Sequence, residues 1–505
     1  MNKSLDVTDV AVRSMGEETL RLDRAVQRRV GSSVVQRLVT DQVVTGLQFM
    51  FDVAAFIVAI VLTELYRGIE TPALSTMLVV LLWSGGNMLV LRHLGLYRID
   101  AVVRGPWSSW RLASVLAVNL LLVSIVATVA PLDGSRWVVA TVMLALALLF
   151  LARAVFSMVI RYGVRHRWLG GNVVLVGYSS AGEKFVRAMQ ARGSGCWWRV
   201  VGVVSDERPQ REGDAYGGLP WLGSTENIRH LVREGMVQQV VLPLPCGTKM
   251  EFEALRRQIA TLPVVLSLTW DWDPPRPVGG PWRLFKANED WRRYEVPIQR
   301  LSDSPSFGWS AVVKLIEDKL LASLALLLLG PLLVVIALLI KLDSPGPVFF
   351  RQKRYGFNHR PIMVYKFRTM YHDSSGTQPF RQATRNDSRI TRIGAFLRRT
   401  SLDELPQLFN VIDGSMSLVG PRPHPVELDD RFRQLIQGFE GRHNVKPGIT
   451  GWAQINGFRG ETDTLEKMEA RIAHDIFYIE NWSLWLDIKI LIRTALGGWS
   501  GENAY

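Results

Sequence analysis

Two adjacent carboxylates, Asp403 and Glu404, stand in the stretch RRTSLDELPQLFNV near the last fifth of the chain. A structural interpretation is a capping box, in which Ser401 and Glu404 bond to the free N–H groups of a helix start. Pro406 argues against it, because a proline at that position interrupts the helix being capped. Pro406 is better placed as the first residue of a helix. The two carboxylates then lie just ahead of that helix, where they are available for chemistry.

Basic side chains are frequent in the segments on both sides of this pair. Two carboxylates among many cations indicate a transferred phosphoryl group and a metal ion. An aspartate can attack phosphorus, while Mg²⁺ held by a second carboxylate neutralises the charge that develops. Each arginine alone is typical of a solvated surface, so the interpretation depends on the cluster. Its members are Lys366, Arg368, Arg389, Arg392, Arg398, Arg399 and Arg422.

The composition indicates a membrane protein with water-soluble parts. The chain has 505 residues, more than one compact domain needs, and carries 59 Lys and Arg against 46 Asp and Glu, a net charge of +13. Its mean hydropathy is +0.12, and the apolar residues are concentrated in a few long runs. The charge suits nucleic acid, anionic lipid or a phosphorylated substrate, and does not choose among them. The 2 cysteines lie outside any metal-ligand spacing, which argues against a zinc or disulfide framework.

Four apolar runs follow a polar N-terminal segment, residues 1–40, which lacks the apolar core of a signal peptide. Each run is close to the roughly 20 residues that cross a bilayer as a helix. Arginines flank the bundle at both ends and fill its second connection, so the positive-inside rule puts both ends of the bundle in the cytoplasm. Asp52 and Asn87 lie within the runs and predict helix–helix hydrogen bonds, with a proton or ion path as the alternative. The predicted bundle spans residues 41–165, with runs at Val43–Leu65, Ala73–Leu91, Leu112–Leu132 and Trp137–Ile160.

The next segment, residues 168–295, alternates buried strands with helices and predicts a parallel, Rossmann-like α/β domain. The stretch NVVLVGYSSAG resembles the start of a dinucleotide-binding unit. Gly177 and Gly182 fit the glycine fingerprint, but Ser179 replaces the glycine that lets the backbone approach pyrophosphate. A weak cofactor site and a structural or sensory module both remain open for this domain.

A fifth apolar run, Leu320–Ile340, has basic residues at both ends and Gly330–Pro331 in its middle. A proline inside a helix removes one backbone hydrogen bond and bends the helix. We therefore predict a re-entrant helix over about residues 314–342, which enters and leaves the membrane on the cytoplasmic side. The alternative is a fifth span with an ordinary proline kink.

The segment from Lys314 to the C-terminus resembles the monotopic phosphoglycosyl transferases. Within them it is similar to the large enzymes that start exopolysaccharides of the colanic-acid and xanthan type. The matching strings are SPGPVFFRQKRYG, VYKFRTM, RITRIGAFLRRTSLDELPQLFNV, MSLVGPRPHP, RHNVKPGITGWAQINGFRGETDTLEKMEARI and WSLWLDIKIL.

The resemblance implies an undecaprenyl-phosphate glucose phosphotransferase activity. Such enzymes transfer glucose 1-phosphate from UDP-glucose to undecaprenyl phosphate, releasing UMP, and use Mg²⁺. Carried onto this chain, Asp403 is the nucleophile that forms a covalent phosphosugar, and Glu404 binds the metal beside it. The Pro421-Arg422-Pro423 turn helps hold the uridine diphosphate, with Arg398 on phosphate. Lys366 and Arg368 complete the substrate-binding residues.

Two positions depart from the family pattern. The re-entrant helix usually begins Lys-Arg-x-x-Asp, whereas this chain has Lys314-Leu315 and retains Asp318. The break is usually Ser-Pro, whereas this chain has Gly330-Pro331. The first change removes an arginine contact with lipid headgroups, and the second removes a side-chain hydrogen bond at the bend.

The predicted fold class is a membrane α-helical bundle of four spans, a Rossmann-like α/β domain, and an α-rich monotopic catalytic domain over residues 305–505. The resemblance implies a bacterial inner membrane location, a cytoplasmic catalytic face, and membrane lipids as partners. No nucleic-acid partner is expected, and a homodimer is left open. Alternative functions are the same reaction with UDP-galactose or another UDP-sugar, and a non-catalytic scaffold of polysaccharide assembly. A nucleotide-sugar oxidoreductase would need an intact glycine fingerprint and a Tyr-x-x-x-Lys pair, which the middle domain lacks.

Overall fold

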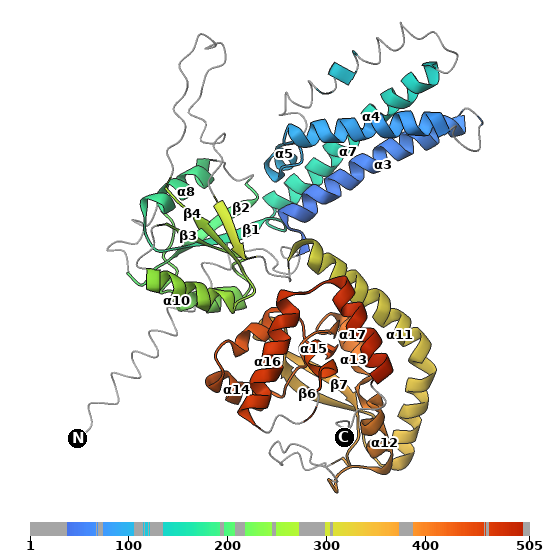
Figure 1. The fold of residues 1–505 in the computed structure, drawn as a ribbon, viewed down its shortest axis with the longest axis vertical. Coiled ribbons are helices and arrows are strands. Elements are labelled where there is room, and N and C mark those ends of the chain that lie inside the picture. Colours follow the sequence, from blue (N-terminus) through green and yellow to red (C-terminus); the bar gives the residue numbers. More distant parts are fainter. Residues whose placement is uncertain are drawn as a thin grey trace. The chain divides into compact units, whose positions relative to one another are not determined.

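The computed structural model describes part of the chain, in two compact units (Figure 1). The first comprises Met1–Asn227, Gly235–Cys246 and Ser267–Gln299, and the second Ile228–Glu234, Gly247–Leu266 and Arg300–Tyr505. The described residues are 38–66, 68, 74–105, 115, 117–119, 121, 135–191, 196–207, 218–244, 249–271, 298–302, 307–372, 387–458, 460 and 464–497.

The first unit contains the helices of the predicted bundle: α3 (Asp41–Tyr66), α4 (Leu74–His93), α5 (Ile99–Arg104) and α7 (Ser135–Arg165). Among the described residues, three helices are long and apolar enough to cross a membrane, at Asp41–Tyr66, Val139–Arg165 and Gly308–Asp343. A membrane helical region is therefore confirmed. Two of these three helices, α3 and α7, belong to the predicted bundle. The second predicted run forms α4, which is not among the three, and the third run, Leu112–Leu132, lies almost wholly outside the described residues. The count of four spans therefore stays a prediction.

Polar side chains inside these helices bond to one another. Asp52 on α3 is fully buried and accepts hydrogen bonds from Arg153 Nη2 at 2.6 Å and from the Tyr97 hydroxyl at 2.7 Å. Asn119 Nδ2 donates to Asn87 Oδ1 at 2.7 Å. A charge in a bilayer is costly unless it is paired. The predicted bonding of Asp52 and Asn87 is thus confirmed, and the sequence analysis missed Arg153 as the partner of Asp52.

The α/β region is a five-stranded sheet in the order β2-β1-β3-β4-β5, and β1 pairs parallel with both β2 and β3. This order is the flavodoxin-like one, in which the strand order reverses between β1 and β3 while these two strands stay parallel. The fifth strand begins beyond the predicted end of the domain at residue 295. The strands are β1 (Gly171–Val176), β2 (Trp198–Val204), β3 (Gln239–Pro243), β4 (Val265–Thr269) and β5 (Ile298–Ser302), with helices α8 (Ser180–Ala191), α9 (Asn227–Arg233) and α10 (Lys249–Ala260).

The turn after β1 contains Ser179 at the position where the fingerprint has its middle glycine. Gly177 has a φ of 77°, a conformation that favours glycine. The hydroxyl oxygen of Ser179 accepts a hydrogen bond from the Gly182 backbone N–H at 3.2 Å. The residue that replaces the middle glycine therefore bonds to the first turn of α8.

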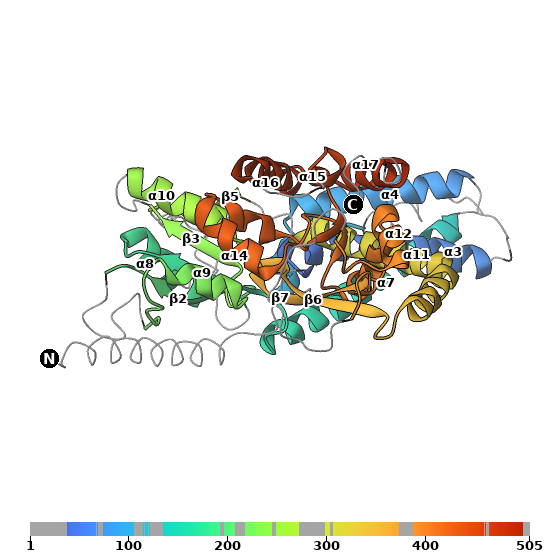
Figure 2. The same ribbon diagram turned by 90° about the horizontal axis from the view of Figure 1, so that it is seen from below.

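The second unit is built on a long helix, α11 (Gly308–Asp343), and on an antiparallel hairpin of β6 (Phe349–Tyr355) and β7 (Pro361–Phe367). A short parallel pair, β8 (Ser417–Val419) with β9 (Gly448–Thr450), lies in the same core. Figure 2 shows α16, α15 and α17 in a row. The remaining elements are η3 (Phe357–His359), α12 (Arg392–Thr400), η4 (Leu402–Glu404), α13 (Gln407–Asp413), α14 (Val426–Leu435), η5 (Phe439–Asn444), α15 (Trp452–Ile455), α16 (Leu465–Glu480) and α17 (Leu484–Gly497).

Helix α11 continues through Pro331 and curves along one side of this unit (Figure 1). Ala322, in its first half, packs in a cluster with Val364, Val411 and Ile490. Ile336 and Ile340, in its second half, pack with Phe367 and Leu397. Both halves of the helix therefore bury one stripe against the same domain.

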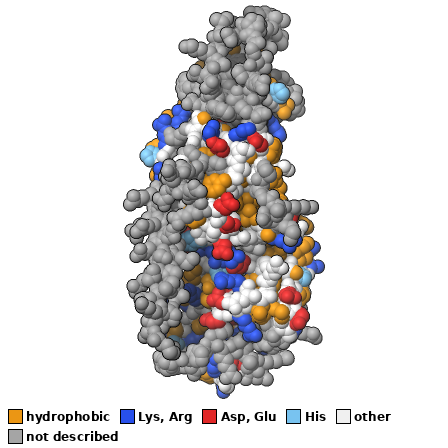
Figure 3. Space-filling view, turned by 90° about the vertical axis from the view of Figure 1, so that its left-hand side faces the viewer, with side chains coloured by type: hydrophobic (Ala, Val, Ile, Leu, Met, Phe, Trp, Pro, Cys, Tyr) orange, Lys and Arg blue, Asp and Glu red, His pale blue; other side chains and the backbone are white. Residues whose placement is uncertain are grey.

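Charges of both signs occur on one face of the described surface. On the face drawn in Figure 3, Lys and Arg side chains lie next to Asp and Glu side chains. Among the described residues visible there, the excess of positive charge is therefore not gathered into one basic patch.

Candidate active site

The two carboxylates lie on a short 3₁₀ turn between two helices. Ser401 ends α12 with a φ of 57°, and η4 follows directly. Pro406 immediately precedes α13, so the predicted helix start is confirmed to within one residue. The side chain of Ser401 makes no capping hydrogen bond, and the Glu404 side chain points to two cations instead. The capping-box interpretation is therefore wrong.

Glu404 is held by Lys366 and Arg422. The Lys366 ammonium, on β7, donates to Glu404 Oε1 at 2.6 Å. The Arg422 guanidinium donates through Nη2 to Oε1 at 2.7 Å and through Nη1 to Oε2 at 3.1 Å. Such two-point contacts are among the strong hydrogen bonds of proteins, and they fix the orientation of both groups. Pro421 and Pro423 flank Arg422 in a turn that follows β8.

Asp403 is beside this group but is not closely paired. Within the described part of the chain no hydrogen bond reaches its carboxylate, and the Lys366 ammonium is 4.0 Å away. Burial raises the pKa of Asp403, while the charge of Lys366 opposes the rise. Burial alone would also raise the pKa of Glu404, but Arg422 and Lys366 outweigh it and hold that pKa well below its usual range. Neighbouring carboxylates whose pKa values are pushed apart are typical of sites where each has its own role.

Arg398 approaches the pair from α12. Its Nε donates to Thr369 Oγ1 at 2.8 Å, and its charge lowers the pKa of Asp403. The approach depends on Gly394, because a Cβ there would lie 2.0 Å from the Thr369 carbonyl oxygen. A glycine thus lets α12 pack against the backbone that follows β7.

Arg368 has a different set of partners from the substrate contacts that the sequence predicts. It is buried, and its guanidinium donates to the carbonyl oxygens of Ser344 and Pro345, both at 2.6 Å. These groups follow the C-terminal end of α11, where carbonyls lack partners within the helix. Among the contacts described here, Arg368 therefore stabilises the end of the membrane helix.

The first half of α11 is fixed by ion pairs. Lys314 Nζ lies 2.6 Å from Asp487 Oδ2 on α17 and 3.1 Å from Asp318 Oδ1. Asp318 also accepts from the Ser417 hydroxyl and the Leu418 N–H, each at 3.0 Å. These two residues of the predicted re-entrant motif thus tie the helix to α17 and β8. Gly330 and Pro331 lie in the middle of α11, within its apolar stretch.

The structure adds two arginines that the sequence analysis did not single out. Arg354 on β6 donates to the Pro423 carbonyl, and burial, together with the charge of Arg422, lowers the pKa of Arg354 to about 10. Arg442 on η5 donates to the Arg422 carbonyl at 2.6 Å. The alternation of side chains along β6 is a signal for Arg354. Phe350 pairs with Lys366, and Arg354 lies four residues further on the same face of the strand as Phe350. No pattern in the sequence indicates Arg442.

The site thus combines one loosely held carboxylate with a second that is locked among cations. Lys366, Arg398 and Arg422 converge here from β7, α12 and the turn after β8, as the sequence predicts. Cations arranged before a phosphoryl group arrives stabilise the charge that it carries and develops. The arrangement can therefore bind a phosphate ester beside a carboxylate that accepts no hydrogen bond from any residue that the structure describes.

Comparison with known proteins agrees with this chemistry. Residues 309–500 match the bacterial sugar transferase family, and residues 92–268 match a CoA-binding domain family. This chain is 44% identical to two proteins named UDP-glucose:undecaprenyl-phosphate glucose-1-phosphate transferase. The one from Escherichia coli (strain K12) matches over 61% of this chain, and the one from Xanthomonas campestris pv. campestris over 57%. The protein of that name from Caulobacter vibrioides is 48% identical over 38% of this chain and 72% of its own length.

The chain belongs to the bacterial sugar transferase family. Its match spans 63% of the E. coli relative and 58% of the Xanthomonas relative.

Proposed function

We propose that this protein transfers glucose 1-phosphate from UDP-glucose to undecaprenyl phosphate and releases UMP. The observation that carries the proposal is the unbonded Asp403 carboxylate beside Glu404, which Lys366 and Arg422 hold in place. The names of the relatives support UDP-glucose and undecaprenyl phosphate as the substrates. The expected product is the lipid-linked glucose that begins an exopolysaccharide repeat unit.

The transfer proceeds in two displacements at one phosphorus atom. An oxygen of Asp403 bonds to the phosphorus that carries glucose, and the bond from that phosphorus to the oxygen of UMP breaks. The phosphate oxygen of undecaprenyl phosphate then attacks the same phosphorus, and the bond to Asp403 breaks. Asp403 is regenerated as a carboxylate, so atoms and charge balance over the cycle. Lys366, Arg398 and Arg422 stabilise the charge on the phosphoryl oxygens in both steps.

The residues present fit Mg²⁺ only if the substrate supplies further ligands. Within the described ranges no group of three or more His, Cys, Asp or Glu side chains is arranged so that it could hold a metal ion. Mg²⁺ usually takes one or two carboxylates together with substrate phosphates and water. Asp403 and Glu404 would hold the ion, Asp403 through oxygens that accept no hydrogen bond among the described residues. When bound, it would neutralise charge on the pyrophosphate group.

We infer that α11 is re-entrant and that the catalytic face lies on the cytoplasmic side of the bacterial inner membrane. A straight helix of 36 residues would extend about 54 Å, well beyond a hydrocarbon core of about 30 Å. Instead the first half of α11 is tied to α17 and β8, and Asp343 near its end accepts from the Ile393 N–H at 3.2 Å. Leu327, in between, is 77% exposed. One domain holding both ends of an apolar helix supports entry and exit on one side.

The proposal is tested with purified protein, radiolabelled UDP-sugars and undecaprenyl phosphate in detergent. We expect transfer of label from UDP-glucose to lipid and an equal amount of UMP. If label is transferred from UDP-galactose and from no other UDP-sugar, the proposed reaction type holds and the transferred sugar is galactose instead of glucose. Absence of both label transfer and UMP release with every UDP-sugar would favour a non-catalytic scaffold and overturn the proposal.

A further inference from the structure

The turn that carries Arg422 is held through three successive carbonyl groups. The Gly448 N–H on β9 donates to the Pro421 carbonyl at 2.9 Å. Arg442 Nη2 donates to the Arg422 carbonyl at 2.6 Å, and Arg354 Nη1 donates to the Pro423 carbonyl. Donors from three separate elements thus fix the backbone on both sides of one side chain. That side chain is the one that makes the two-point contact with Glu404.

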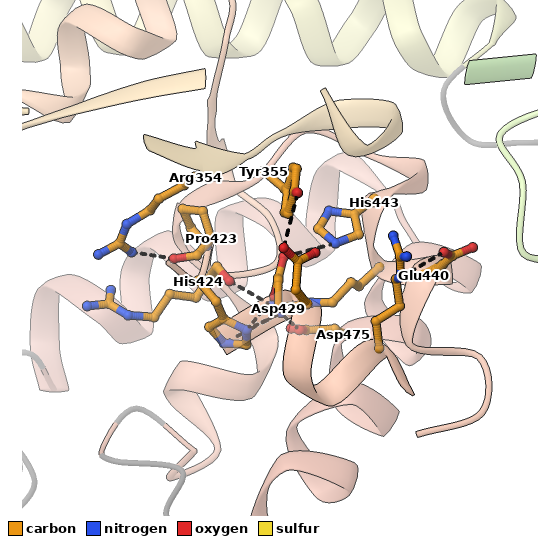
Figure 4. A network of polar contacts seen from close by, with 12 residues as sticks. Arg354, Tyr355, Pro423, His424, Asp429, Glu440, His443 and Asp475 are labelled. Atoms are coloured by element: carbon orange, nitrogen blue, oxygen red, sulfur yellow. Dashed lines mark hydrogen bonds and ion pairs between the residues drawn. The ribbon is translucent and has the colours of Figure 1, made fainter. Parts of the chain in front are cut away.

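Arg442 is itself held by acidic side chains, and Figure 4 shows the network to which Asp429 and Asp475 belong. It is 3% exposed, and its Nη2 lies 2.9 Å from Asp475 Oδ2 on α16. Its Nη1 lies 3.4 Å from Asp429 Oδ1 on α14, and Asp429 also contacts His424 Nδ1 at 3.1 Å. Burial lowers the pKa of His424 to about 3, so the ring is neutral at pH 7. Asp475 and Asp429 therefore anchor the guanidinium that holds the Arg422 carbonyl.

Arg354 reaches the turn from a different part of the fold. It lies on β6, and its Nη2 donates to Gln352 Oε1 at 2.9 Å on the same strand. The hairpin that carries Arg354 also carries Lys366, the second cation on Glu404. One strand pair therefore positions Lys366 directly and Arg422 through the backbone of its turn.

We propose that Arg442 and Arg354 are positioning residues, which aim Arg422 at Glu404 by holding the carbonyls of Arg422 and Pro423. The inference rests on the proposed function for its effect on rate. The competing explanation is that both arginines only stabilise the fold. In that case, removing either arginine lowers the activity by the same factor whether or not Arg422 is present.

A double-mutant cycle separates the two explanations. Displacement of a catalytic group by about 1 Å can cost on the order of 10²-fold in rate. We expect Arg442→Gln to lower kcat/KM by roughly 10- to 100-fold in the natural chain, but by less than about threefold in Arg422→Gln, because residues acting through one another are not additive. Arg431→Gln, which removes an exposed arginine of α14, should leave the rate unchanged in both backgrounds. Equal fractional losses in both backgrounds would overturn the proposal.

Arg354→Gln gives the same cycle and removes hydrogen bonds to the Pro423 carbonyl and Gln352 instead of the contacts with Asp429 and Asp475, so it decides the question if Arg442→Gln does not fold. A structure of the full-length Arg442→Gln protein gives a readout that does not depend on activity. We expect the Arg422 guanidinium to leave hydrogen-bond distance of Glu404. Retention of both hydrogen bonds would refute the positioning role, even if wild-type protein proved inactive with UDP-sugars and the proposed function failed.

Discussion

Arg422 donates two hydrogen bonds to Glu404, one to each carboxylate oxygen, at 2.7 and 3.1 Å. The two residues come from separate elements, a turn after β8 and the 3₁₀ turn η4. Their contact keeps a buried carboxylate ionised and places a guanidinium next to Asp403. The planar fork of arginine makes this arrangement, and the single ammonium of lysine does not.

We therefore expect Arg422→Lys to lower kcat/KM by about 10²-fold, the order seen when one donor to a developing anion is removed. The measurement is label transfer from UDP-glucose to undecaprenyl phosphate. Arg431→Lys is the matched control, because Arg431 is an exposed arginine of α14 and should tolerate the change. Full activity of Arg422→Lys would show that the two-point contact is not needed.

The pH dependence of kcat/KM should report Asp403. Because burial raises the pKa of this carboxyl above its ordinary value of 3.8, activity should rise with pH as Asp403 ionises, later than for an ordinary aspartate. The charge of Lys366 lowers that pKa, so Lys366→Gln should move the acid limb to higher pH. Lys353→Gln, on the exposed face of the same hairpin, should not move it. A shift to lower pH in Lys366→Gln would contradict the assignment of the acid limb to Asp403.

Gly394 should be intolerant of a side chain. A Cβ at this position would lie 2.0 Å from the Thr369 carbonyl oxygen, so α12 would have to move away from the backbone after β7. Forced overpacking typically costs about 1–3 kcal/mol. We expect Gly394→Ala to lower the thermal unfolding midpoint and the activity together, since Arg398 moves with α12. Gly497→Ala is the control, because a Cβ there would meet nothing within 4 Å. Equal midpoints for the two variants would show that the close approach is not real.

The path of α11 can be tested by straightening it. Replacing Gly330-Pro331 by Leu-Leu restores the missing backbone hydrogen bond and should favour a spanning helix. We expect loss of activity and transfer of a C-terminal tag to the periplasmic side, whereas Leu328→Ala should change neither.

The unaltered path is read from single cysteines at Ser310 and Pro347, in chains with Cys196→Ser and Cys246→Ser; Pro347 is exposed just after α11. With a membrane-impermeant reagent on intact spheroplasts, neither position should react from outside. Labelling at Pro347→Cys but not at Ser310→Cys would show that α11 spans the membrane.

Local patterns predicted the elements better than their connections. Pro406 placed the start of α13, and the apolar runs placed α3, α4 and α11, because each depends on residues close in sequence. The strand order β2-β1-β3-β4-β5 depends on long-range pairing, which leaves no local signal.

The same distinction holds within the site. Lys366 and Arg422 were recognised with the carboxylates because charge and resemblance pointed to phosphate. Arg442 was missed because its role is a contact with a backbone carbonyl, which any residue at position 422 would offer. Arg368 looked like a phosphate ligand in sequence, and only the fold shows its guanidinium on the carbonyls after α11.

The central claim is that Asp403 attacks phosphorus. The direct measurement is mass spectrometry of the protein after incubation with UDP-glucose and Mg²⁺, without lipid acceptor. We predict an added glucose phosphate on the peptide that contains Asp403, which disappears when undecaprenyl phosphate is supplied and never forms in Asp403→Asn. That variant should lose more than about 10⁴-fold in turnover, beyond what loss of acid–base help explains. An unmodified Asp403 in wild-type protein that releases UMP and forms lipid-linked sugar, or an Asp403→Asn protein within tenfold of wild type, would contradict the account.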